Sequence, residues 1–100
     1  MDQKTRDVLI AARTIIADPA MWYQGAYSAS GKIYRLSEPC CASCAIFRVA
    51  PNDSAHRAID WMAQFTPDHK GLSVFNDEPT TTHADILGVF DRAIAGEQSA

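Results

Sequence analysis

Residues 82–96, THADILGVFDRAIAG, carry the clearest fold signal in the chain. Thr82 and Asp85 have the spacing of a capping box, in which a hydroxyl and a carboxylate bind unpaired backbone N–H groups of the first helical turn. Gly96 is a typical helix end. The apolar residues between them recur with the period of one helix face, and they are Ile86, Leu87, Phe90, Ala93 and Ile94. The stretch therefore predicts an amphipathic helix that begins after Thr82 and stops at Gly96.

Three further segments show a helical period. Residues 5–17 form the first, which ends before a proline because the residue preceding proline is pushed out of the helical region. Residues 39–50 form the second, with a proline in the favoured first position and Cys40 outside the apolar face. That face holds Cys41, Ala42, Ala45, Ile46 and Val49. The third follows the break at residues 51–54, which offers capping side chains, and runs to about Phe65.

Four amphipathic helices with short connections should pack around one core. We therefore predict a mainly α, four-helix bundle-like single domain over residues 1–100. Residues 19–36, between the first two helices, lack a helical period and should form an irregular aromatic segment or a short β-hairpin around residues 29–31. The connector at residues 70–78 should be anchored to the core by Leu72, Val74 and Phe75.

Composition and charge narrow the classes of function. The net charge is −3, and the acidic residues outnumber the basic ones in residues 51–100. Because nucleic-acid binding normally needs a basic stripe, we expect no nucleic-acid partner. No apolar run reaches the roughly 18 residues of a membrane helix, so we expect no membrane. The N-terminus lacks a signal pattern and the cysteines do not form a disulfide framework, which indicates a cytoplasmic location.

Two of the clustered cysteines, Cys41 and Cys44, have the spacing of a reactive pair near a helix N-terminus, where the thiol pKa can fall. A thiol-dependent enzyme could use Cys41 or Cys44 as nucleophile and His69 as base. Asn76 or Asp77 would then orient the imidazole. The alternative is that the cysteines are small packing residues of the core, and we favour it because no strand–helix–strand pattern surrounds them.

A structural zinc site is a second alternative. It would need Cys41, Cys44 and two of His56, His69 and His83, but these spacings differ from the compact zinc-finger pattern. We expect no metal and no cofactor.

The aromatic segment is the best candidate for binding, because aromatic residues with polar groups are common at interfaces. The asparagine–aspartate pair ahead of the last helix is a second candidate, although such pairs also shape turns and cap helices. The candidate binding residues are Trp22, Tyr23, Tyr27, Tyr34, Asn76 and Asp77. Alternatively, Trp22 and Tyr34 cover one end of the core.

Three stretches of the chain carry a family resemblance. They are residues 22–27 (WYQGAY), 41–46 (CASCAI) and 75–82 (FNDEPTTT). They resemble the Trp-x-x-Gly segment, the Cys-x-x-Gly-Ala helix and the Trp-Asn-Asp-x-x-x-x-Thr turn of an uncharacterised family of small bacterial and phage proteins. Cys44 stands where that family prefers glycine, and Phe75 stands for its tryptophan. The resemblance implies a fold and a compartment but no activity.

We therefore expect a small cytoplasmic protein-binding or regulatory module, of the phage-type accessory or inhibitor kind, whose partner is another protein. The alternatives are the thiol-dependent enzyme and the structural zinc module. Nothing in the sequence indicates an oligomeric state.

Overall fold

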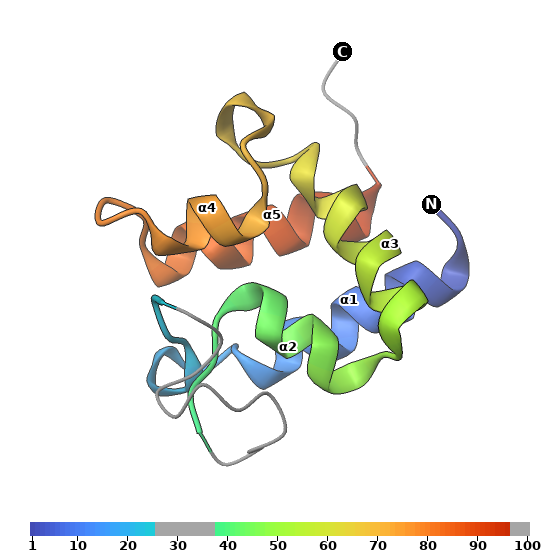
Figure 1. Ribbon diagram of the computed structural model, residues 1–100, viewed down its shortest axis with the longest axis horizontal. Helices are drawn as coiled ribbons and strands as arrows, with labels where there is room; N and C mark the ends of the chain where they lie inside the picture. The colour runs from blue at the N-terminus through green and yellow to red at the C-terminus, as the bar shows by residue number, and fades with distance from the viewer. Residues whose placement is uncertain (26–37, 97–100) are drawn as a thin grey trace.

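The computed structural model describes residues 1–25 and 38–96, and this part of the chain is mainly helical (Figure 1). The helices are α1 (Gln3–Ile15), α2 (Ala42–Val49), α3 (Asn52–Ala63), α4 (Leu72–Asp77) and α5 (His83–Ala95), and two 3-10 turns, η1 (Pro19–Met21) and η2 (Pro67–His69), lie in the connections. The predicted fold class is confirmed, with the short helix α4 added to the four helices that the sequence indicated. The hairpin predicted around residues 29–31 lies outside the described residues.

The ends of α5 follow from its sequence as predicted. The Thr82 hydroxyl accepts the backbone N–H of Asp85 at 3.1 Å, and the Asp85 carboxylate accepts the N–H of Thr82 at 2.9 Å. At the other end, Gly96 takes a left-handed conformation with φ of 73°. Glycine adopts this conformation at little cost because it has no Cβ. The capping box and the glycine stop are therefore both formed.

The start of α2 differs from the prediction. We expected a helix from Pro39, but Cys40 lies in a β-bridge, Cys41 is extended and the helix begins at Ala42. Cys40 forms an isolated parallel bridge, in which its N–H donates to Met21 O at 2.9 Å and its carbonyl accepts Tyr23 N–H at 3.0 Å. This pairing holds the chain in an extended conformation, so the helix starts only after it.

The connector between α3 and α5 also differs from the prediction. It contains the helix α4, and only two of the three expected anchors, Leu72 and Phe75, are buried. Val74 is 56% exposed. Residues three apart share a helix face, whereas the residue between them points elsewhere. The helical conformation of the connector therefore turns Val74 out of the core.

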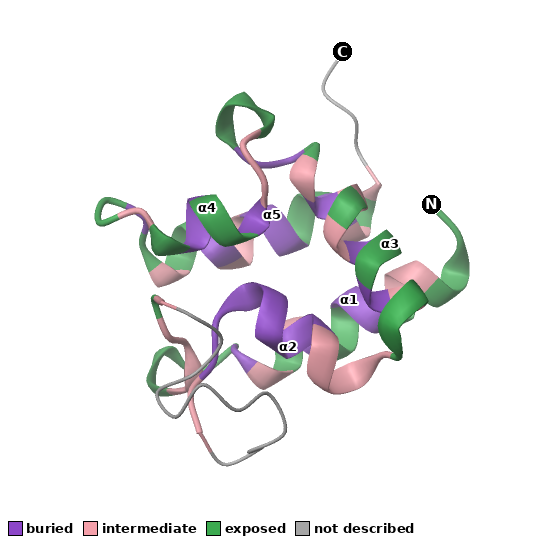
Figure 2. Ribbon diagram, viewed as in Figure 1, coloured by how far each residue is buried: buried purple, intermediate pink, exposed green. Residues whose placement is uncertain are grey.

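One apolar core lies between the helices. α1 packs against α2, α3 and α5, while α2 and α3 also contact each other and α4. Buried residues lie on the sides of the helices that face one another (Figure 2). The largest fully buried apolar side chains are Phe90, Leu9, Ile16, Ile46, Met62, Leu72, Ile86 and Val89. None of the helices in residues 1–25 and 38–96 combines the length and the apolar character that a membrane span requires.

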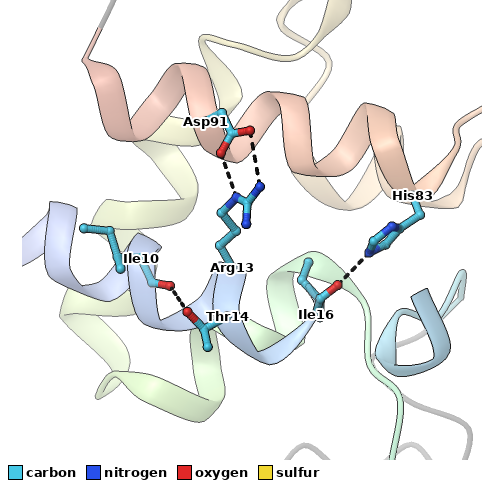
Figure 3. Close-up of polar contacts among 6 residues, drawn as sticks. All are labelled: Ile10, Arg13, Thr14, Ile16, His83 and Asp91. Carbon is cyan, nitrogen blue, oxygen red and sulfur yellow. Dashed lines mark hydrogen bonds and ion pairs between the residues drawn. The ribbon is translucent and has the colours of Figure 1, made fainter. Parts of the chain in front are cut away.

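Polar contacts join α5 to the segment around α1 (Figure 3). The Arg13 guanidinium donates to the Asp91 carboxylate at 2.7 Å and 3.4 Å. Nε2 of His83 lies 2.7 Å from the carbonyl oxygen of Ile16, just beyond the end of α1. His83, one of the possible zinc ligands, therefore contributes to the packing of α5.

Candidate functional site

Asn76 is a buried polar residue whose side chain makes four hydrogen bonds. It lies near the end of α4 with no exposed surface. Its Oδ1 accepts two hydrogen bonds, from Trp22 Nε1 at 2.7 Å and from the backbone N–H of Ala42 at 3.1 Å. Its Nδ2 donates two, to Tyr23 O at 3.1 Å and to Asp77 Oδ1 at 3.0 Å. An asparagine amide can make four such bonds, so the side chain is fully satisfied.

Two of the partners of Asn76 are groups that need a hydrogen bond in the folded chain. Ala42 is the first residue of α2, and its N–H has no acceptor within the helix. Trp22 is half-buried and packs against the core. Its ring centroid lies 5.8 Å from that of His83. Trp22 therefore covers one end of the core, and its indole N–H is satisfied by Asn76.

The segment that follows Trp22 is held beside the end of α4. Gly25 N–H donates to Asp77 Oδ1 at 2.9 Å. The side-chain amide of Gln24 lies within hydrogen-bond distance of three backbone carbonyls, those of Asn76, Glu78 and Thr81, at 3.1, 2.8 and 3.1 Å. These bonds fix the chain from α4 to the start of α5.

Gly25 occupies a position that only glycine suits. Its φ is 137°, and a Cβ there would lie 2.9 Å from Cε2 of Tyr23. The ring of Tyr23 therefore lies directly over the glycine, and a larger residue would displace it.

We call Trp22, Tyr23, Gln24, Gly25, Ala42, Asn76 and Asp77, with the hydrogen bonds that join them, the Asn76 network. It brings together the three stretches that carry the family resemblance, although they lie up to 54 positions apart. Of the candidate binding residues, it contains Trp22, Tyr23, Asn76 and Asp77. Tyr27 and Tyr34 lie outside the described residues.

The three cysteines are buried, and none of them forms a disulfide. Cys40 and Cys44 have no exposed surface, and Cys41 is 4% exposed. Cys41 is the N-cap of α2, where its Sγ accepts the N–H of Cys44 at 3.3 Å. Burial raises the pKa of the Cys41 thiol. The hydrogen bond between the side chains of Cys40 and Cys44 raises the pKa of Cys40 and lowers that of Cys44.

His56 and His69 are exposed, whereas the three thiols are buried. His69 is exposed on η2, where it and Asp68 have positive φ. His56 is exposed on α3 and meets the ring of Phe47 edge-on, with centroids 5.5 Å apart. Within the described residues, no three side chains of His, Cys, Asp or Glu are grouped so as to hold a metal ion.

A hollow of about 510 Å³ opens between the beginning of α1 and the beginning of α3. It is lined by Lys4, Pro51, Asn52, Asp53, Ser54 and Arg57. The lining is polar, carries both signs of charge, and includes no cysteine, histidine or aromatic residue. The hollow is therefore separate from the Asn76 network and from the thiols.

The sequence did not reveal the position of Cys40 beside the site or the role of Gln24 within it. Cys40 falls outside the apolar face when residue 40 is placed on a helix, but it is fully buried because it lies on the extended bridge. Gln24 is an exposed residue whose role depends on three distant carbonyls. Its position inside the Trp22–Gly25 stretch was the one signal that could have found it.

Comparison with known proteins identifies a family. The sequence model of a family of unknown function, DUF6197, matches residues 1–96. The comparison found no match among the curated proteins or the solved structures.

Proposed function

From the premise that the chain belongs to the family of unknown function DUF6197, we propose that this protein acts by binding another protein. It would serve as a small accessory or regulatory module in the cytoplasm, of the kind that phages use to inhibit or modulate a host component. The partner that we propose is a protein with a basic, partly apolar surface.

The observation that carries this proposal is the Asn76 network itself. Asn76 uses all four of its hydrogen bonds inside the fold. Trp22 covers the core, and the three thiols are buried. Asn76, Trp22 and the three thiols are thus engaged in structure, which favours a function performed by the surface.

The surface that the network positions is the one around α4. We call Tyr23, Gln24, Val74, Asp77 and Glu78 the α4 surface. Val74 is the most exposed of the large apolar residues in the described chain, at 56%. Asp77, three residues further along α4, lies on the same helix face and is exposed. The bonds from Gln24 and Gly25 hold the Tyr23 segment next to them.

Charge indicates the chemistry of the partner. Within the described residues, Asp77 takes both of its hydrogen bonds through Oδ1, which leaves Oδ2 to accept a bond from a partner. Glu78 is already paired with Lys70 Nζ at 2.6 Å, so Asp77 is the carboxylate on this surface that complements a lysine or arginine of the partner. Such complementarity raises the rate of association. Val74 would supply the apolar contact at the centre.

A pair of matched variants tests the proposal. Val74→Lys removes the apolar contact and adds a positive charge three residues before Asp77. Ile10→Lys makes the same change on α1, where Ile10 is 45% exposed and lies three residues after Asp7. Proteins captured from a native lysate are identified by mass spectrometry, purified and titrated against each variant.

We expect Val74→Lys to weaken binding at least about tenfold, which corresponds to roughly 1.4 kcal/mol, and Ile10→Lys to leave it unchanged. Binding should also weaken as salt rises, because screening reduces the attraction between exposed charges. Equal affinities for the two variants, or a complex insensitive to salt, would show that the α4 surface is not the interface.

A further inference from the structure

The Asp77 carboxylate and the ring of Tyr23 both lie against Gly25. The backbone N–H of Gly25 donates to Asp77 Oδ1 at 2.9 Å. A Cβ on the same glycine would lie 2.9 Å from Cε2 of Tyr23. Because the backbone nitrogen and the Cβ position of one residue are about 2.5 Å apart, Oδ1 and Cε2 can be separated by no more than about 8 Å. One planar cation can therefore contact the carboxylate and the ring together.

The Asp77 carboxylate is fixed in position, and its charge is available. Its Oδ1 accepts from Gly25 and from Asn76 Nδ2 at 2.9 Å and 3.0 Å. Among residues 1–25 and 38–96 no cationic side chain pairs with Asp77, whereas the neighbouring Glu78 is paired with Lys70. Asp77 is exposed, and a group whose orientation is already fixed loses little freedom on binding. Oδ2 is thus a preorganised acceptor that a partner can reach.

Two neighbouring groups on the α4 surface suit a long cationic side chain. Tyr23 is only half-buried, and an aromatic ring attracts a cation that lies within about 6 Å of its centre. Val74 is exposed on the face of α4 that carries Asp77, and it offers an apolar contact to methylene groups. The surface therefore presents a ring, a carboxylate and an apolar contact to the same side chain.

This combination favours arginine over lysine. A guanidinium is planar, so it can stack on the ring while its N–H groups point in its own plane toward a carboxylate. It is also more weakly hydrated than an ammonium. A lysine ammonium is compact and strongly hydrated, so it must give up more of its water to reach the ring. The ring of Tyr23 is therefore the group that should distinguish the two cations.

We propose that Tyr23, Val74 and Asp77 form a binding site for one arginine side chain of the partner protein. The guanidinium stacks on the ring of Tyr23 and donates to Asp77 Oδ2, and the methylene groups pack on Val74. The proposal rests on the proposed protein-binding function and extends it by naming the residue that the partner inserts. We call these three residues the arginine site.

Short peptides test the arginine site without the partner. The full chain, labelled with ¹⁵N, is titrated at low salt with acetyl-Gly-Arg-Gly-amide and followed by NMR. Two further peptides carry lysine or citrulline in place of arginine, and citrulline keeps the shape of arginine without its charge. We expect saturable binding of the arginine peptide in the millimolar range, with shifts at Gly25 and Asp77, at least about threefold weaker binding of the lysine peptide, and none of the citrulline peptide. Equal affinities for the arginine and citrulline peptides would overturn the proposal.

Variants of the two polar contacts give the second measurement. Asp77→Asn keeps Oδ1 as an acceptor for Gly25 and Asn76 but removes the charge, and we expect it to weaken the arginine peptide at least about fivefold. Asp60→Asn makes the same change on an exposed residue of α3 and should have no effect. Tyr23→Leu should lose the preference for arginine over lysine, whereas Tyr23→Phe keeps the ring and should keep the preference. Circular dichroism checks that each variant is folded, and Asp77→Asn decides the question if Tyr23→Leu is not. Unchanged binding to Asp77→Asn would refute the site.

The results separate this proposal from the proposed function. If the arginine peptide binds Asp77→Asn as it binds the unchanged protein, while Val74→Lys still weakens the captured partner, the arginine site alone is wrong. If the peptides behave as expected but Val74→Lys leaves the captured partner unaffected, the arginine site is supported, and the α4 surface is not the interface with that partner.

Discussion

Replacing Asn76 with alanine should test how much of the fold depends on the Asn76 network. The substitution removes four hydrogen bonds at once. It leaves the N–H of Ala42 buried without an acceptor, and the groups on Trp22 and Tyr23 partly buried without partners. The side chains around position 76 would also border a cavity.

The size of the effect follows from these groups. A buried polar group left unsatisfied costs about 1–3 kcal/mol. With one such group fully buried and two partly buried, we expect Asn76→Ala to lower the free energy of unfolding by about 3–5 kcal/mol. A domain of this length is stabilised by roughly 5–15 kcal/mol in total. The loss would lower the melting temperature by at least about 12 °C.

Asn76→Asp tests the amide nitrogen separately from the amide oxygen. The remaining oxygen can still accept from Trp22 and Ala42, but the oxygen that replaces Nδ2 faces two acceptors, Tyr23 O and Asp77 Oδ1. Burial and the neighbouring carboxylate should raise the pKa of the introduced carboxyl. A raised pKa in the folded state means that the variant is best tolerated at low pH and loses stability as pH rises through that value.

The assay is urea unfolding followed by circular dichroism, at several pH values for Asn76→Asp. Asn52→Ala is the matched control, because Asn52 is exposed and makes no side-chain cap on α3. It should change stability by less than about 0.5 kcal/mol. If Asn76→Ala costs less than about 1 kcal/mol, or Asn76→Asp loses no more stability at neutral pH than in acid, the network is not what holds these segments together.

Three further predictions concern other parts of the chain. The buried hydroxyl of Thr81 has no hydrogen-bond partner among residues 1–25 and 38–96, so Thr81→Val should raise the free energy of unfolding by about 1 kcal/mol in urea titrations; a loss of stability would contradict this. Hydrogen bonds from the side chain and N–H of Thr5 lower the pKa of Asp2. The ionised Asp2 carboxylate therefore adds to the free energy of unfolding above the unfolded pKa near 3.8, and this stabilisation is lost as pH falls through the pKa of the folded state. Asp2→Asn keeps the cap and should show a weaker loss of urea resistance in acid, whereas identical pH profiles would remove Asp2 as the cause. Iodoacetamide near neutral pH should label the three buried cysteines slowly in the native protein and fast in denaturant; rapid labelling of one native thiol would favour the thiol-dependent enzyme.

The three stretches that carry the family resemblance meet in the Asn76 network. Trp22, Ala42 and Asn76 each sit in a different stretch, and the structure joins them by hydrogen bonds through one amide. The arrangement gives the three residues one shared structural role. The backbone N–H of Ala42 has no acceptor within α2, and Oδ1 of the buried Asn76 accepts from it. Without this bond the N–H of Ala42 would be buried and unsatisfied.

The sequence by itself determined the elements whose signals are local. α5 could be placed from its capping box, its apolar period and Gly96, because each of these acts within a few residues along the chain. The tertiary structure alone decided the start of α2, where pairing of Cys40 with Met21 and Tyr23 prevailed over a proline well suited to begin a helix. It also decided which groups Asn76 satisfies. Hydrogen bonds across 34 to 54 positions depend on how the helices pack, and no periodicity along the chain records that packing.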